Sequence, residues 1–219
     1  LTEKGGKIWL EGDTLTLKSG SNINATGATG GGEVLVGGGW QGSGGLHQAT
    51  MVTMEAGATI DVSATKVGNG GTAVLWSDVT KAESLTIVAG TILAKGGAVG
   101  GNGGKIETSG HSVDIGRVSV SASAPKGTGG LWLIDPTDAT INQTVANSYA
   151  TTLNGGTSVL NEVTGAITWS SNVTLTKNAG GDATLTGAKI RLKALAAGGT
   201  ERELTTAEKG GFSFDDLPP

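Results

Sequence analysis

The chain has 219 residues and 40 of them are glycine, a share far above the roughly 7% that is usual in proteins. It contains no cysteine, which excludes disulfide scaffolds and thiolate metal sites, and its net charge of -4 at pH 7 argues against a basic surface for nucleic acid. Hydrophobic residues make up 37% of the chain, so we expect a folded core, and no apolar run reaches the roughly 18 residues that membrane insertion needs.

A unit of three short strands recurs along the first part of the chain. Each unit opens with a Gly-Gly pair, and its strands alternate apolar and polar residues and are rich in Thr, Val and Ile. We interpret the glycines as turns or as points of close approach between units. Extra residues occur at 37–48 and 77–83. The Gly-Gly pairs that open the first four units begin at Gly5, Gly31, Gly70 and Gly103, and a fifth unit opens at Gly129.

Units of this kind cannot bury their apolar faces alone, and stacking them creates a continuous core. The sequence therefore predicts an all-β fold, a parallel β-helix with three strands per coil. An antiparallel sandwich is the alternative, but it does not explain the constant three-strand frame. The predicted inward columns are Ile8, Val34, Ala73, Ile106 and Trp132 on the first face; Leu15, Val52, Leu85 and Val113, and Leu17, Met54, Ile87 and Ile115, on the second; and Ile23, Ile60, Ile92 and Val118 on the third.

A short helix is predicted at residues 144–154. Val145, Tyr149 and Leu153 recur at a spacing of four residues behind Thr144, a candidate N-cap, and Asn154-Gly155 supplies a C-cap. Alternating strands then resume. They are predicted at residues 166–169, 172–176, 182–186 and 189–192.

The chain divides into three parts on these patterns. Residues 1–136 are expected to form coils with Gly-rich loops, and residues 137–196 to continue the coils with a helical insertion. Residues 197–219 form a tail that acts as a cap or a linker. The tail is charged and mildly helical at 201–209 and places Phe212 and Phe214 in alternation.

Several segments carry a family resemblance in their order along the chain. They are GNGGTAVLWSD at 68–78, GGNGGKIETSG at 100–110, GLWLIDP at 130–136, AITWSSN at 166–172 and DATLT at 182–186. This series resembles large bacterial exoproteins of the filamentous-haemagglutinin type. The resemblance covers most of residues 5–194.

The resemblance implies a right-handed β-helix in the secreted partner of a Gram-negative two-partner secretion system. Such exoproteins cross the outer membrane unfolded through a β-barrel transporter, and their surface fibres serve in adhesion, aggregation or biofilm formation. The Asn-Pro-type motifs of the secretion domain do not occur here, so we expect the transporter to recognise an upstream domain. The lack of cysteine, and of a signal-peptide pattern at residues 1–4, fits a mature chain that is secreted or displayed at the cell surface.

Catalysis is not expected, although other β-helices are polysaccharide lyases and hydrolases. Such enzymes need clustered carboxylates and a basic residue. The alignment spreads the candidate carboxylates over different faces and coils, and His47 and His111 are expected on a loop and a turn without a second His or Cys nearby. We therefore assign no catalytic residue, metal or cofactor. The carboxylates considered are Glu11, Glu55, Asp61, Glu107 and Asp114.

The five Trp are prominent in a chain with 1 Tyr and 2 Phe, and Trp stacks well on sugars. Trp132 falls in an inward column, whereas Trp9 and Trp76 are expected to point outward or lie near an edge. Trp40 lies on the Gly-rich loop, where it either contacts a ligand or folds back over the flank of the helix. The candidate ligand-binding residues are Trp40, Gln41 and His47.

These features predict a rigid β-solenoid segment of a large adhesin. It would act in adhesion, aggregation or biofilm formation through contact with a host or biofilm glycan or a surface protein. One alternative is a purely structural stalk that presents a distal adhesive or toxin domain. Another is a β-helix enzyme that cleaves polysaccharides.

Overall fold

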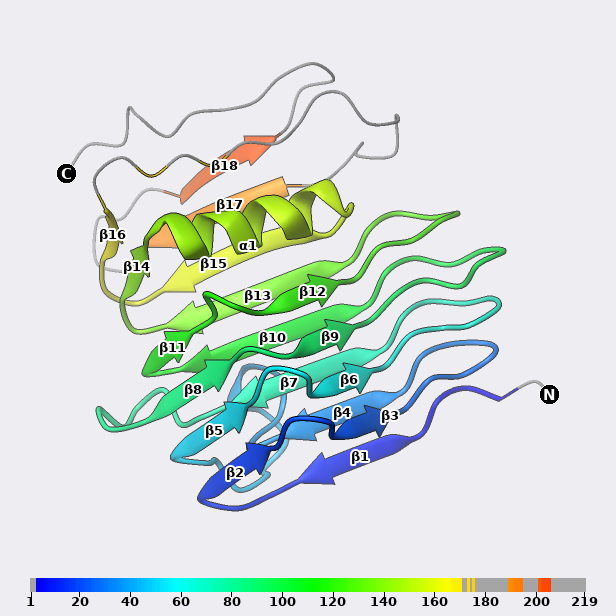
Figure 1. Cartoon of the computed structure of the whole chain (residues 1–219), viewed down its shortest axis with the longest axis horizontal. Coiled ribbons are helices and arrows are strands. Elements are labelled where there is room, and N and C mark those ends of the chain that lie inside the picture. The colour runs from blue at the N-terminus through cyan, green and yellow to red at the C-terminus, as the bar shows by residue number, and fades with distance from the viewer. Residues whose placement is uncertain (1–2, 171–172, 174, 176–188, 195–200, 206–219) are drawn as a thin grey trace.

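A computed structural model describes residues 3–170, 173, 175, 189–194 and 201–205 (Figure 1). Its strands form stacked sheets. The first sheet contains, in spatial order, β1 (Lys7–Leu10), β4 (Glu33–Val36), β7 (Thr72–Trp76), β10 (Lys105–Gly110), β13 (Leu131–Pro136), β15 (Ser158–Val163), β17 (Lys189–Ala194) and β18 (Glu201–Thr205).

Two shorter sheets and one strand pair complete the described structure. The second sheet contains β2 (Thr14–Leu17), β5 (Met51–Met54), β8 (Leu85–Val88) and β11 (Ser112–Asp114). The third contains β3 (Asn22–Asn24), β6 (Thr59–Asp61), β9 (Thr91–Leu93) and β12 (Ser119–Ser121). The pair consists of β14 (Ala139–Ile141) and β16 (Ile167–Trp169).

The pairing is parallel and excludes the antiparallel sandwich for the residues that the structure describes. From β1 to β9, each strand pairs in parallel with the strand three places further along the chain. The antiparallel pair is β17 with β18. The described part of the protein is therefore mainly β, with parallel sheets and one α-helix, and each of the three larger sheets takes one strand from every Gly-Gly unit of the first four.

The predicted inward column of the first sheet is confirmed. Its members face one another in successive strands, and Val159 of β15 continues the column beyond Trp132. Side chains are fully buried from the second unit onward, whereas Ile8 at the end of the stack is half-buried. The confirmed members are Ile8, Val34, Ala73, Ile106 and Trp132.

In the second sheet the prediction is wrong at one strand, by one residue. The sequence pattern places Leu85 and Ile87 inside, but β8 buries Thr86 and Val88, and the two predicted residues are half-buried. Ile115 is buried in the core as expected. The observed columns are Leu15, Val52, Thr86 and Val113, and Leu17, Met54 and Val88.

Hydrogen bonds explain why a threonine occupies this inward position. The Thr86 hydroxyl lies 2.8 Å from the Ser109 carbonyl oxygen and 2.9 Å from Ser77 Oγ. These partners satisfy a buried hydroxyl that would otherwise destabilise the core.

The third sheet requires a similar correction. Val120 of β12, and not Val118, follows Ile92 in the column that begins with Ile23 and Ile60. Val118 is also buried, immediately before β12. Because the two valines lie two residues apart, both satisfy the same alternating pattern.

The predicted helix is confirmed as α1 (Gln143–Asn154), but its N-cap is wrong. Asn142, not Thr144, caps the helix, because its side-chain oxygen accepts a hydrogen bond from the Val145 N–H at 3.0 Å. The helix ends at Asn154, and Gly155 is its C-cap, as predicted. Its apolar face packs into the core, and α1 contacts β12, the last strand of the third sheet.

The chain beyond α1 agrees only in part with the prediction. The strands expected at 166–169 and 189–192 are present as β16 and β17, whereas residues 201–205 form a strand rather than a helix. The backbone register pairs Arg191 with Glu203 in the antiparallel arrangement of these two strands. The strands predicted at 172–176, apart from residues 173 and 175, and at 182–186 lie outside the described residues, as do Phe212 and Phe214.

The Gly-Gly pairs are points of close approach between neighbouring units. At Gly71 a side chain would overlap the carbonyl oxygen of Gly32 in the preceding unit, and Gly104 has the same relation to Gly71. The Thr72 N–H donates to that Gly32 carbonyl at 2.9 Å, so the overlap occurs where the strands begin to pair. At Gly6, in the first unit, an added Cβ would meet no atom within 4 Å.

Gly71→Ala is expected to lower the free energy of unfolding by about 1–3 kcal/mol, because the new methyl group must displace the backbone of the neighbouring unit. Gly6→Ala is the matched control and should change stability by roughly 0.5 kcal/mol or less. Urea unfolding of both variants measures the difference. Equal effects would show that the glycine pairs are not contacts between units.

Candidate functional site

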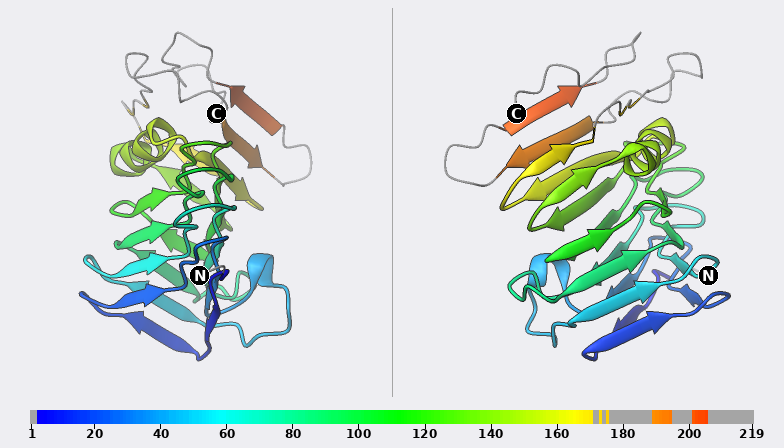
Figure 2. Two further views of the ribbon diagram at one scale, coloured as in Figure 1. Left: turned by 90° about the vertical axis from the view of Figure 1, so that its right-hand side faces the viewer. Right: turned by 60° about the vertical axis from the view of Figure 1, so that its left-hand side comes forward.

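The loop at residues 37–48 folds back over the outward face of the first sheet. It contains a short 3-10 turn, η1 (Trp40–Gly42), which lies on the outside of the stacked strands (Figure 2). The loop covers the outward-pointing Trp76, whose Nε1 donates to Gln48 Oε1 at 2.9 Å. Trp76 points outward from the inward column as predicted, yet it is only 3% exposed. A second, smaller apolar cluster results, formed by Leu35, Val74 and Trp76 with Trp40, Leu46 and Val79 against it.

A buried carboxylate anchors this loop. Glu107 lies on β10, pairs with Val74 in the sheet register and is 0% exposed. Its Oε2 accepts a hydrogen bond from the Gln41 N–H at 2.9 Å, and its Oε1 accepts one from Ser109 Oγ at 2.9 Å. Among the described residues, Gln41 is the non-glycine residue with a positive φ, 49°. The bond to Glu107 therefore helps to hold a strained backbone conformation.

Burial changes the acid chemistry of this face. It raises the pKa of Glu107 to about 7, although the hydrogen bonds from Gln41 and Ser109 act in the opposite direction. It also raises the pKa of Asp135, on the neighbouring strand β13, to about 6, with a further contribution from the charge of Glu162. Both acids are therefore more readily protonated than an exposed carboxylate.

The structure brings two of the three candidate ligand residues together. Trp40 is half-buried and folds back toward the sheet, with Lys105 Nζ 4.6 Å from its ring centroid. Trp40 Nε1 donates to Gln41 Oε1 at 3.1 Å. His47 instead faces the turn between β1 and β2, where its Nε2 lies 2.8 Å from Asp13 Oδ1.

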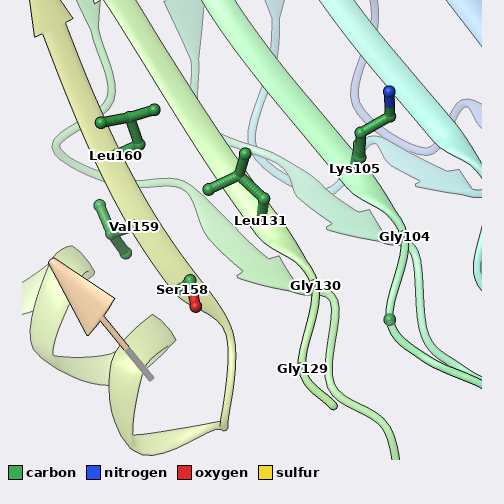
Figure 3. A pocket seen from close by; sticks show the side chains of 9 residues that line it. Gly104, Lys105, Gly129, Gly130, Leu131, Ser158, Val159 and Leu160 are labelled. Carbon is green, nitrogen blue, oxygen red and sulfur yellow. The ribbon is translucent and has the colours of Figure 1, made fainter. Parts of the chain in front are cut away.

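A hollow of about 330 Å³ opens on the outward face beside Lys105 (Figure 3). Leu131 and Leu160 supply aliphatic surface, Ser158 a hydroxyl and Lys105 a positive charge. The side chains come from β10, β13 and β15, which are neighbours in the first sheet. Two glycine pairs, Gly103-Gly104 and Gly129-Gly130, line the hollow at the starts of two of these strands.

The sequence alone does not single out this part of the surface. One signal is nevertheless present for Glu107, which is the third residue after its Gly-Gly pair. The equivalent residues in the other units are apolar: Trp9, Leu35, Val74 and Leu133. An acid in a row of large apolar residues indicates either a buried carboxylate or a functional position. No comparable sequence signal identifies Lys105 or Leu131.

The candidate catalytic carboxylates each take part in a different local contact. Glu55 accepts from Lys18 Nζ and from the Ser19 N–H, and these contacts hold its pKa below the ordinary value. His111 Nδ1 lies 3.0 Å from Thr137 Oγ1. Within the described ranges, no group of three or more His, Cys, Asp or Glu is arranged to hold a metal ion. The remaining contacts are from the N–H groups of His47 to Glu11, Ser63 to Asp61 and Gly116 to Asp114.

No protein-family model matches the chain. No curated protein matches it either. The resemblance to filamentous-haemagglutinin-type exoproteins therefore rests on the sequence motifs given above. In the part of the chain that the structure describes, no helix is both long enough and apolar enough to cross a membrane.

Proposed function

We propose that the chain is a segment of a secreted or cell-surface adhesin of a Gram-negative bacterium, built as a right-handed parallel β-helix with three strands per coil. The pairing of each strand from β1 to β9 with the strand three places ahead supports this architecture. Right-handedness is favoured because connections between parallel strands of one sheet are almost always right-handed. Secretion by a two-partner system, through an upstream domain, follows from the family resemblance.

One observation carries the functional part of the proposal. The loop at 37–48 interrupts the repeat, yet it is fixed on the outside of the stack beside a hollow rather than extended into solvent. Repeat proteins commonly bind through loops and surfaces that their stacked scaffold holds in place. We therefore assign binding to this face and propose no catalytic activity.

The chemistry of the face suits a glycan of the host or of a biofilm. Trp40 offers part of an indole ring, the exposed Gln41 offers an amide, and the hollow offers aliphatic surface. Sugar rings present both hydroxyl groups and C–H faces, which such mixed surfaces recognise. Adhesion, aggregation or biofilm formation would follow from many weak contacts along a fibre.

A glycan array probed with the wild-type protein and with Trp40→Ala tests this function. We expect selective binding by the wild type and a loss of about tenfold or more in the variant, because the indole supplies most of the aromatic surface of the loop. Trp9→Ala is the control. Trp9 is 51% exposed on β1, away from the hollow on β10, β13 and β15, so its removal should leave binding unchanged.

If the wild-type protein bound none of the glycans on the array, this would contradict the adhesin function and favour the alternative of a purely structural stalk. The stalk has its own support, since Lys105 covers one side of the Trp40 ring and the inward columns run continuously through the stack. Release of oligosaccharides from a bound polysaccharide would instead establish the second alternative, an enzyme that cleaves polysaccharides.

A further inference from the structure

Lys105 is a cation on the outward face of the first sheet, and its charge acts on the carboxylate of Glu107, two residues further along the same strand. Its side chain is exposed at the rim of the hollow and forms no ion pair with any residue that the structure describes. Its neighbours in the sheet register are neutral, Thr72 on one side and Leu131 on the other. In the same row of the first sheet, Lys7 lies 3.3 Å from Glu33. The ammonium of Lys105 is therefore available to an external anion.

Aliphatic surface lies directly beside this charge. Leu131 and Leu160 line the hollow, and Figure 3 shows their side chains on the strands that follow the one that carries Lys105. At about 330 Å³, the hollow is at the small end of the size range of ligand sites, which is roughly 300–1,000 Å³. An occupant that matches it needs an apolar face and an anionic edge.

We propose that this hollow binds a carboxylated sugar ring, of the uronic-acid type, whose carboxylate pairs with Lys105 and whose C–H face lies on Leu131 and Leu160. The inference rests on the proposed glycan binding and names the class of sugar. The ammonium and the carboxylate would form a charge-assisted hydrogen bond at the rim. Trp40 would then act partly through Lys105, because it holds the lysine side chain against its ring.

A buried carboxylate close to Lys105 makes this binding depend on pH. Glu107 lies on the same strand beneath the loop, and Asp135 and Glu162 lie on β13 and β15 of the same sheet. Of these, Glu107 is the carboxylate whose charge acts on Lys105, and it repels an anionic ligand when it is ionised. Since burial raises the pKa of Glu107 to about 7, its charge is largely lost at pH 5.5. Affinity for an acidic sugar should therefore be higher at pH 5.5 than at pH 8.

Calorimetric titration with trigalacturonate and with its methyl ester tests the proposal, because the two probes share their rings and differ in charge. We expect the ester to bind about tenfold or more weakly, and Lys105→Gln to lose a similar factor for the acid form. Lys7→Gln is the matched control and should bind like the wild type. Binding of the acid form should also weaken at high salt.

Equal binding of the acid and the ester, or unchanged binding by Lys105→Gln, would overturn the proposal. Trp40-dependent binding of neutral glycans without binding of trigalacturonate would leave the proposed function intact and remove this inference alone. Polyglutamate is the third probe. If it bound as tightly as trigalacturonate, the hollow would be a site for acidic peptide and not for a sugar.

Discussion

Trp132→Ala is expected to lower the free energy of unfolding by about 3–5 kcal/mol. Trp132 is 0% exposed and lies between Ile106 and Val159 in the inward column of the first sheet. Its ring meets Tyr149 of α1 edge to face, with centroids 5.7 Å apart, and its Nε1 donates to Thr108 Oγ1 at 3.0 Å. Truncation removes these contacts and leaves a cavity that the stacked strands cannot close.

Trp9→Ala provides the comparison, because Trp9 is 51% exposed on the outward face of β1. It should cost roughly 1 kcal/mol or less. Trp132→Phe should fall between the two, since it keeps an aromatic ring but loses the hydrogen bond to Thr108. Urea unfolding curves measure all three. If the Trp132→Ala variant were as stable as the Trp9→Ala variant, the assignment of Trp132 to the inward column of the first sheet would be wrong.

Stability is expected to fall as pH rises from about 4.5 to 7, by about 3 kcal/mol, because of Glu107. The pKa of Glu107 is raised in the folded state, so the folded protein binds this proton more tightly than the unfolded chain. The stabilisation is complete below the ordinary pKa of 4.5 and is lost as pH passes about 7. Asp135 acts in the same direction, because burial also raises its pKa.

Glu107→Gln isolates the contribution of Glu107. The amide can accept from the Gln41 N–H and donate to Ser109 Oγ, so it keeps both contacts without a charge. The variant should resemble the wild type at pH 4.5, exceed it in stability at pH 8, and show a flatter pH profile, with the slope from Asp135 remaining. Glu83→Gln, at an exposed turn residue, should follow the wild-type profile. Identical profiles for wild type and Glu107→Gln would contradict the prediction.

The sequence predicts the first sheet well because the Gly-Gly pairs fix its register. Each pair lies directly before a strand of this sheet, so the positions of Ile106 and Trp132 follow by counting from Gly104 and Gly130. The parallel pairing follows from the same repeat, since equivalent strands must lie next to each other when units stack.

The second and third sheets are less predictable because no fixed residue precedes their strands. The segment from Leu85 to Val88 has large apolar residues on both faces, so alternation cannot decide which face points inward. The deciding contacts are those of Thr86 with Ser77 and Ser109, which come from another strand and a connecting loop. Such contacts between distant segments are not visible in a local pattern.

The candidate site is predicted only in outline. The sequence indicates that the loop at 37–48 is an insertion and that Trp40 is its prominent aromatic residue. It does not show that the loop folds back, because this depends on the bond between Gln41 and the Glu107 carboxylate, 66 residues further along the chain. It also places His47 with Trp40 and Gln41, whereas the structure directs His47 toward Asp13.

The parallel pairing of the three sheets has a mechanical consequence. Traction along the stack would be shared by three hydrogen-bond ladders between each pair of the first four units, and these must rupture together. Beyond β12 the second and third ladders stop, and only the first sheet and the short β14–β16 pair continue among the described strands. Under tension the stack would therefore begin to separate next to α1, leaving Lys105 on β10 joined to the units before it.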